Sequence, residues 1–166
     1  MLSACWFESI EDVDLGADRL RSGRYGMIET TGGSLERIVL RPWPFLVSLP
    51  ELLPLGPAWR PSGPEDRCRL FYNQPLGHSK FLALKYVSCT AGTSYATFRK
   101  ALATLDQIAE IKRSDALLCD ASSQRLSERF LQRMGWEPHA PRWGHRNYIR
   151  RFYGVYPQRP AANRAC

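Results

Sequence analysis

Residues 115–139, DALLCDASSQRLSERFLQRMGWEPH, predict a strand followed at once by a helix, and this pair of elements decides the fold. The apolar run 115–121 is typical of a short strand that is covered on both faces. Ser122 or Ser123 then begins a helix, since either hydroxyl can accept a hydrogen bond from a first-turn amide. Gly135–Trp136 ends it, because glycine suits the left-handed residue that follows many helices. The expected inward residues of this helix are Leu126, Phe130, Leu131 and Met134.

A longer helix precedes this unit. Over residues 94–112 the apolar residues are spaced alternately three and four apart, as on one face of an amphipathic helix. Thr93 or Ser94 can cap its first turn. The expected inward residues are Tyr95, Phe98, Leu102, Leu105 and Ala109.

Two β-hairpins are predicted further upstream. YGMIET and LERIVLRPW flank Thr31–Ser34, and CRLFYN and KFLALKYVS flank the turn at 74–78. The strand over 81–88 is joined to the strand over 115–121 through the longer helix. The two strands should therefore pair in parallel by a right-handed crossover.

The fold class is thus α/β, with a mixed α+β sheet that is mostly antiparallel, one parallel crossover and flanking helices. Its 166 residues suit a single domain. Seven of the twelve prolines lie in 42–64, which excludes a central strand there and favours a long ordered loop with a short helical turn at Pro50–Leu53. The parts of the domain in chain order are an N-terminal helix (near 8–21) and hairpin within 1–41, the loop over 42–64, an α/β core over 65–156 with a last strand at 145–154, and a tail over 157–166.

Positive charge is concentrated in the second half of the chain. Of the formal net charge of +7, residues 1–83 contribute −1, with 9 basic and 10 acidic side chains, and residues 84–166 contribute +8, with 14 and 6. Nineteen of the 23 basic residues are arginine, whose planar fork suits phosphate. A polyphosphate cofactor, a nucleic acid and an anionic membrane are all compatible with this charge.

The sequence carries no targeting or membrane signal. The N-terminus lacks a basic region followed by an uninterrupted apolar one, and the most apolar stretch, 43–59, is broken by four prolines. We therefore expect a cytoplasmic protein with no membrane partner. Its five cysteines are odd in number and form no CxxC pair, which favours reduced thiols and no metal site.

Residues 115–153 resemble a segment of the GCN5-related N-acetyltransferase (GNAT) superfamily, in which a strand leads into a helix that ends at a glycine and an aromatic residue. Gly135–Trp136 matches that ending, and RNYIRRFY resembles the late strand that closes the family's sheet. The resemblance covers about residues 78–153 and implies a GNAT-like acyl-CoA N-acyltransferase fold. Gln124 stands where the family commonly has Asn, and Leu131 stands where many members carry the tyrosine that protonates the departing thiolate.

The resemblance also implies acetyl-CoA or another acyl-CoA as cofactor. In the family, a Q/R-x-x-G-x-G/A loop lets consecutive amides at a helix N-terminus hold the pyrophosphate. Val87–Gly92 keeps the last glycine of that pattern and changes the other two positions. An ordinary capped strand-to-helix turn explains the same small residues, so both interpretations stay open. The predicted cofactor-binding residues are Ala91, Gly92, Thr93, Ser94, Arg99, Gln124 and Arg125.

Transfer of an acyl group to an amine needs a base for the amine proton and a donor for the thiolate. Asp120 is at the C-terminal end of the strand over 115–121, where open α/β sheets usually bind ligands, and it is the candidate base. Tyr95, in the first turn of the longer helix, is the other catalytic candidate. Alternative proton carriers are Cys119, His78 and His139.

Two functions are compatible with these features. The first is an acyl-CoA-dependent N-acetyltransferase with a small-molecule or peptide amine as acceptor. The second is a catalytically inactive GNAT-like module that binds nucleic acid or protein through its basic half, including the stripe Arg125, Arg129 and Arg133 and the segment HRNYIRRFYGVYPQR. A solvated helix face and an ordinary strand of a mixed sheet are the favoured explanations of these two basic features.

Overall fold

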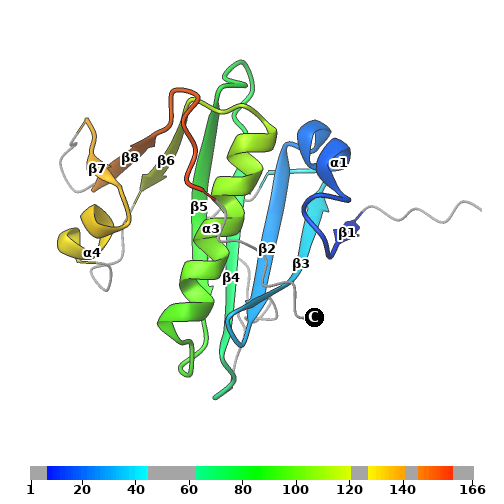
Figure 1. The fold of residues 1–166 in the computed structure, drawn as a ribbon, viewed down its shortest axis with the longest axis vertical. Coiled ribbons are helices and arrows are strands. Elements are labelled where there is room, and N and C mark those ends of the chain that lie inside the picture. The colour runs from blue at the N-terminus through cyan, green and yellow to red at the C-terminus, as the bar shows by residue number, and fades with distance from the viewer. Residues whose placement is uncertain (1–6, 45–62, 121–126, 141–145, 159–166) are drawn as a thin grey trace, which may run out of the picture.

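The computed structural model describes residues 7–44, 63–120, 127–140 and 146–158, which form one twisted sheet with helices against it (Figure 1). Among these residues, eight strands follow the order β1-β3-β2-β4-β5-β6-β8-β7, and every pair except β5 and β6 is antiparallel. The predicted mixed α/β sheet with one parallel pair is confirmed. The elements are β1 (Glu8–Ile10), α1 (Ala17–Ser22), β2 (Tyr25–Thr31), β3 (Ser34–Arg41), β4 (Arg67–Asn73), β5 (Phe81–Cys89), α3 (Tyr95–Ile111), β6 (Ala116–Asp120), α4 (Glu128–Arg133), β7 (Glu137–Pro138) and β8 (Asn147–Arg151).

Both predicted hairpins are present. β2 and β3 pair around Gly32 and Gly33, whose positive φ angles of 58° and 78° are those that a tight hairpin turn requires. β4 and β5 pair from Cys68 opposite Cys89 at one end to Asn73 near the turn. The helical turn expected at Pro50–Leu53 lies outside the described residues.

The prediction of a helix near residues 8–21 is wrong for the first half of that range. Glu8–Ile10 forms β1 and pairs with β3, and the helix begins only at Ala17. Ile10 is 2% exposed and joins the core as a strand residue. Between the two elements the Asp12 carboxylate accepts hydrogen bonds from the amides of Asp14 and Leu15, which fixes a turn that a continuous helix would exclude.

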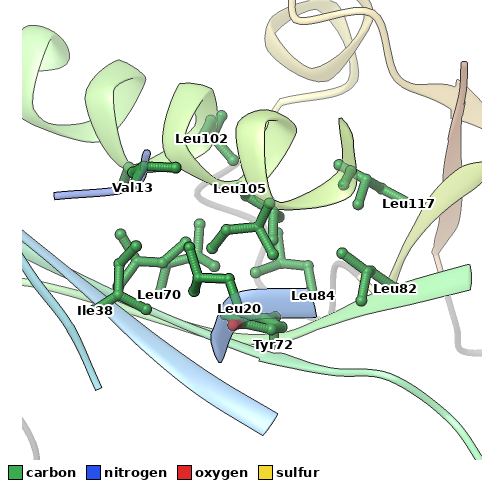
Figure 2. Close-up of a cluster of buried hydrophobic side chains, with 14 of the residues drawn as sticks. Val13, Leu20, Ile38, Leu70, Tyr72, Leu82, Leu84, Leu102, Leu105 and Leu117 are labelled. Carbon is green, nitrogen blue, oxygen red and sulfur yellow. The ribbon is translucent and has the colours of Figure 1, made fainter. Parts of the chain in front are cut away.

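Helix α3 lies against one face of the sheet (Figure 1), and its buried residues join the core formed with the strands. Its buried face includes Leu102 and Leu105, which face Leu70 and Leu84 of the central strands (Figure 2). Leu105 is fully buried, so its truncation to alanine should destabilise the fold by about 2–5 kcal/mol. Tyr95 was expected on this inward face, but it is 55% exposed. The buried face of α3 therefore begins at Thr97.

The segment after α3 follows the predicted order of strand, helix and strand. α4 is capped by Ser127, whose hydroxyl accepts from the amide of Phe130, so the described helix begins later than Ser122 or Ser123. Its end is as predicted: Gly135 has φ 81°, and the Trp136 amide donates to the carbonyl of Leu131 at 3.0 Å. Trp136 is 2% exposed, which ties this turn to the core.

No helix in the described ranges is long and apolar enough to span a bilayer. The same residues contain no group of three or more His, Cys, Asp or Glu side chains placed to hold a metal ion.

Candidate functional site

β5 and β6 separate partway along their length. The parallel ladder joins Phe81–Leu84 to Ala116–Cys119, so Leu84 and Cys119 are its last partners. β5 then continues to Cys89 alongside β4. β6, β7, β8 and α4, here called the wing, diverge from β5 on one side of α3 (Figure 1). In the described part of the chain, the edge of β5 beyond Leu84 therefore has no neighbouring strand.

A β-bulge marks the point of separation. Phe71 and Tyr72 are neighbours on β4, but they pair with Tyr86 and Leu84, so Lys85 is an extra residue in β5. Such a residue bends its strand and increases the local twist. The bulge thus turns the second half of β5 away from β6 immediately after the last parallel pair.

The side chains of Lys85, Cys119 and Asp120 lie at this point of separation. Burial raises the pKa of the Cys119 thiol to about 12, the charge of Asp120 also raises it, and the ammonium of Lys85 lowers it. A thiol with so high a pKa stays protonated at neutral pH and is a poor nucleophile. Asp120 is exposed at the last position of β6, in register with Asn147 of β8. Its carboxylate is thus at the carboxyl end of the parallel pair, where open α/β sheets bind ligands.

The turn between β5 and α3 is held against the segment that begins β4. The Thr90 amide donates to the carbonyl of Arg67 at 3.1 Å, and the Thr93 hydroxyl donates to the same oxygen at 2.6 Å. A Cβ on Gly92 would lie 2.1 Å from the carbonyl oxygen of Pro64. Glycine is therefore required at this position for the close approach of two backbone segments.

The Asp66 carboxylate accepts a hydrogen bond from one of the backbone amides that were predicted to bind phosphate. The Ser94 amide donates to Asp66 Oδ1 at 2.7 Å, and the Ser94 hydroxyl donates to Oδ2 at 2.9 Å. The bond from the Ser94 amide is the main cause that lowers the pKa of Asp66, so this half-buried carboxylate is ionised at the N-terminus of α3. Ser94 is also the helix cap, accepting from the Thr97 amide at 3.2 Å. A phosphate at this turn would use the amides of Ala91 and Gly92 and would lie beside a negative charge.

The first turns of α3 contact α4 of the wing. The Tyr95 hydroxyl donates to the sulfur of Met134 at 3.7 Å, and its ring packs edge-on against Phe130 with centroids 6.0 Å apart. Phe98 packs against the same Phe130 ring, with centroids 5.6 Å apart. The guanidinium of Arg99 lies over the Tyr95 ring at 5.6 Å. The structure thus brings two predicted site residues, Tyr95 and Arg99, into contact.

The remaining predicted residues of α4 fall into two groups. Leu131 is 5% exposed and belongs to the core, so no proton donor is available at that position. Arg129 and Arg133 are exposed. Gln124 and Arg125 lie outside the described residues.

The arginines of the last strand make contacts within the protein. Arg150 is only 16% exposed at its side chain and forms an ion pair with Asp106 of α3, with Nη1 3.0 Å from Oδ2. Arg151 pairs with Glu137 of β7. Arg146, directly before β8, donates to the hydroxyl of Tyr148 at 3.0 Å. These contacts reduce the positive charge that this strand offers to an external ligand.

Of the two candidate histidines, His78 lies away from the separation of β5 and β6, whereas His139 is beside Asn147, the register partner of Asp120. His78 is in the hairpin turn before β5, at the opposite end of the parallel ladder, where its ring packs edge-on against Phe81. The His139 amide donates to the carbonyl of Asn147 at 2.8 Å, and its side chain is exposed.

Three features of the site were not anticipated. No feature of the sequence indicates the bulge at Lys85, since strand-like residues continue on both sides of it. Asp66 carries no local signal, because it reaches α3 from another segment of the chain. Cys68 and Cys89 face each other across the β4–β5 hairpin. That pairing follows from counting outward from the turn, although the bulge shifts the register by one residue.

Comparison with known proteins gives two matches among solved structures. One is an acetyltransferase assigned to the GNAT family from Desulfovibrio desulfuricans, with 16% identity over 52% of this chain and a TM-score of 0.43. The match spans 61% of the length of that protein. The other is nourseothricin acetyltransferase, with 12% identity over 88% of this chain and 98% of its own, and a TM-score of 0.39. No family model and no curated protein matches the sequence.

Proposed function

We propose that the chain is a divergent GNAT-type acyltransferase that binds an acyl-CoA and transfers its acyl group to an amine. One observation carries this proposal: the parallel ladder ends at Leu84 and Cys119, whereas β5 continues to Cys89 and into the Gly92 turn. The sequence pattern that resembles the family surrounds this same point.

The exposed edge of β5 gives a physical reason for an elongated amide ligand. Backbone donors and acceptors need partners, and a strand edge without a neighbour can pair with an extended chain. The pantetheine arm of CoA is such a chain, with two amide groups and a terminal thioester. Binding along β5 would direct the thioester toward the Lys85 bulge and the phosphates toward the turn at Ala91 and Gly92.

Asp120 and Tyr95 are the proposed catalytic residues. Asp120, at the carboxyl end of β6, would accept the proton of the attacking amine. Tyr95 would protonate the leaving thiolate. The Tyr95 hydroxyl contacts Met134 of α4, one turn after Leu131, so this role requires the thioester to extend from the Lys85 bulge to the contact between α3 and α4.

Nucleic-acid binding by the basic half is the less favoured alternative. Arg150 and Arg151 are engaged in ion pairs with Asp106 and Glu137. A surface that binds nucleic-acid phosphates needs arginines that are not already paired with carboxylates of the protein, so that they can neutralise the phosphates and release their counterions. The acyl-CoA proposal needs only donors at one turn and is compatible with those internal pairs.

Thermal unfolding in the presence of ligand tests the proposal. Acetyl-CoA and CoA at saturating concentration should raise the melting temperature, since about 100 times the dissociation constant corresponds to about 2.7 kcal/mol. ADP at the same concentration is the control for general polyphosphate binding. Stabilisation equal to that by ADP, or none, would reject the cofactor.

A salt titration tests the alternative. Phosphate-driven binding of single-stranded RNA or DNA weakens steeply as salt rises. We expect no binding at 150 mM salt and only weak, salt-sensitive binding below it. Tight binding at 150 mM salt that CoA does not compete with would favour the nucleic-acid function instead.

A further inference from the structure

Cys68 and Cys89 form a thiol pair at the end of the β4–β5 hairpin. The two residues are register partners on adjacent antiparallel strands, and their sulfur atoms are 3.4 Å apart. The pair is at the last position of β5, directly before the Thr90–Ser94 turn. No role in acyl transfer requires two thiols here.

The backbone geometry at this pair suits a covalent bond between them. The Thr90 amide donates to the carbonyl of Arg67, the hydrogen bond that flanks a non-hydrogen-bonded pair in an antiparallel ladder. At such pairs the Cα atoms are about 4.5 Å apart, within the range of about 4.4–6.8 Å found across disulfides. A disulfide between Cys68 and Cys89 therefore needs side-chain rotation and little backbone movement.

The two thiols differ in access and in acidity. Cys68 is fully buried, whereas Cys89 is exposed. Contact with Cys68 lowers the pKa of the Cys89 thiol, burial works against this, and the Thr93 hydroxyl lowers it further. The pKa of Cys68 is raised by the contact with Cys89, by burial and by the neighbouring negative charge. Cys89 is thus the thiol that ionises first and that solvent reaches.

We propose that Cys89 and Cys68 form a thiol–disulfide exchange site for low-molecular-weight disulfides, with Cys89 as the attacking thiol and Cys68 as the resolving one. The Cys89 thiolate attacks one sulfur of glutathione disulfide. The bond between the two glutathione sulfurs breaks, a mixed disulfide forms on Cys89, and one glutathione leaves and takes up a proton.

Cys68 completes the reaction. Once Cys89 is in the mixed disulfide, it no longer carries the charge that opposes ionisation of Cys68. The Cys68 sulfur attacks Cys89 Sγ, the bond to glutathione breaks, and the second glutathione leaves with the Cys68 proton. Two protein thiols are oxidised to one disulfide, and one glutathione disulfide is reduced to two glutathione molecules.

Cys119 provides an internal comparison. Burial raises its pKa to about 12, so it has little thiolate at neutral pH. Its register partners are Leu84 and Tyr148, so neither neighbouring strand brings a second thiol to it. Cys119 should therefore react with disulfides far more slowly than Cys89.

The test uses the full chain with Cys5→Ser and Cys166→Ser, which removes the two cysteines outside the described residues. After incubation with glutathione disulfide at pH 7.5, intact mass and peptide mapping should show loss of two hydrogen atoms, a Cys68–Cys89 disulfide and no retained glutathione. Adding Cys68→Ser should leave one glutathione on Cys89. Adding Cys89→Ser should abolish both products, and Cys119→Ser should change nothing.

Several results would overturn the proposal. They are lasting glutathione on Cys89 in the parent protein, modification of Cys119 at the rate of Cys89, or no reaction of Cys89 in the folded protein. If Cys68→Ser does not fold, as judged by circular dichroism, Cys68→Ala replaces it. The product formed by the parent protein decides the question in either case. The proposal does not depend on acyl transfer, since every readout is a mass.

Discussion

Leu84 of β5 and Cys119 of β6 are the last partners of the parallel ladder, and the next residue of β5 is the Lys85 bulge. This relationship leaves the last five residues of β5, 85–89, beyond the ladder. The separation, the bulge and the turn at Gly92 thus follow one another along a single strand. A ligand that follows β5 from the bulge to the turn would meet backbone groups along its whole length.

Asp66 should weaken phosphate binding at the turn. Asp66→Asn keeps an oxygen that can accept from the Ser94 amide and removes the negative charge beside Ala91 and Gly92. We expect CoA to bind several-fold more tightly, in line with the removal of one nearby like charge. Isothermal titration calorimetry at low and high salt measures the effect. Asp18→Asn, a side chain 95% exposed on α1, is the control. Unchanged affinity would mean that the phosphates bind elsewhere.

Gly92 should be essential to the turn. In Gly92→Ala the new methyl group would lie 2.1 Å from the carbonyl oxygen of Pro64, so one of the two backbone segments must move. We expect a loss of about 1–3 kcal/mol in the free energy of unfolding, together with weaker CoA binding. Urea denaturation measures the first, with Ala91→Gly as the neighbouring control. A variant as stable as the parent protein would show that the two segments are not held together.

Asp120 and Tyr95 should affect turnover more than binding. Asp120→Asn removes the proposed proton acceptor, and Tyr95→Phe removes the proposed proton donor. In each variant we expect kcat to fall by about 10²–10⁴ with a small change in the KM for acetyl-CoA. The acceptor is an amine found by screening, and release of free CoA thiol is the readout. Asp18→Asn and Tyr153→Phe are matched controls on exposed side chains. Full activity in either site variant would remove that residue from the mechanism.

Asp106 should make stability depend on pH. Burial raises the pKa of Asp106 to about 6, although Arg150 acts to lower it. Because the folded pKa is above the ordinary value of 3.8, the contribution of Asp106 to stability is full below pH 3.8 and is lost as pH rises through 6. Asp106→Asn should therefore gain stability relative to the parent protein between pH 4 and 7, by at most about 3 kcal/mol.

Urea unfolding of both proteins at several pH values measures this difference in the free energy of unfolding. Because the two proteins share all other titratable groups, the titration of those groups cancels in the difference. The absolute offset between the two proteins also includes the changed bond to Arg150, so only its trend with pH is diagnostic. A constant difference across that range, or one of opposite slope, would show that Asp106 ionises normally in the fold.

The element order could be read from the sequence because local chemistry specifies it. Gly32–Gly33 fixes one hairpin, Ser94 caps α3, and Gly135 ends α4, each through residues close in sequence. Tyr95 was wrongly predicted to be buried. Helical periodicity gives the spacing of a helix face, but it does not show whether the first residue of that face is covered by the sheet. β1 was missed because its pairing with β3 depends on a residue, Ile10, that fits a helix equally well.

The site was less predictable because its geometry arises between distant segments. The contacts of Asp66 with Ser94 and of Pro64 with Gly92 join residues separated by 28 positions in the chain. The bulge at Lys85 depends on how β4 pairs with β5. Asp120, by contrast, was placed correctly at the end of β6, since strand ends are visible in the apolar pattern.

The most direct test of the central claim is calorimetric titration of the protein with acetyl-CoA and with adenosine 3′,5′-bisphosphate, which lacks the pantetheine arm. If that arm pairs with the edge of β5 beyond Leu84, acetyl-CoA should bind at least about tenfold more tightly, a difference of about 1.4 kcal/mol. Equal affinities, or no binding of acetyl-CoA, would contradict the assignment of β5 as an acyl-CoA site.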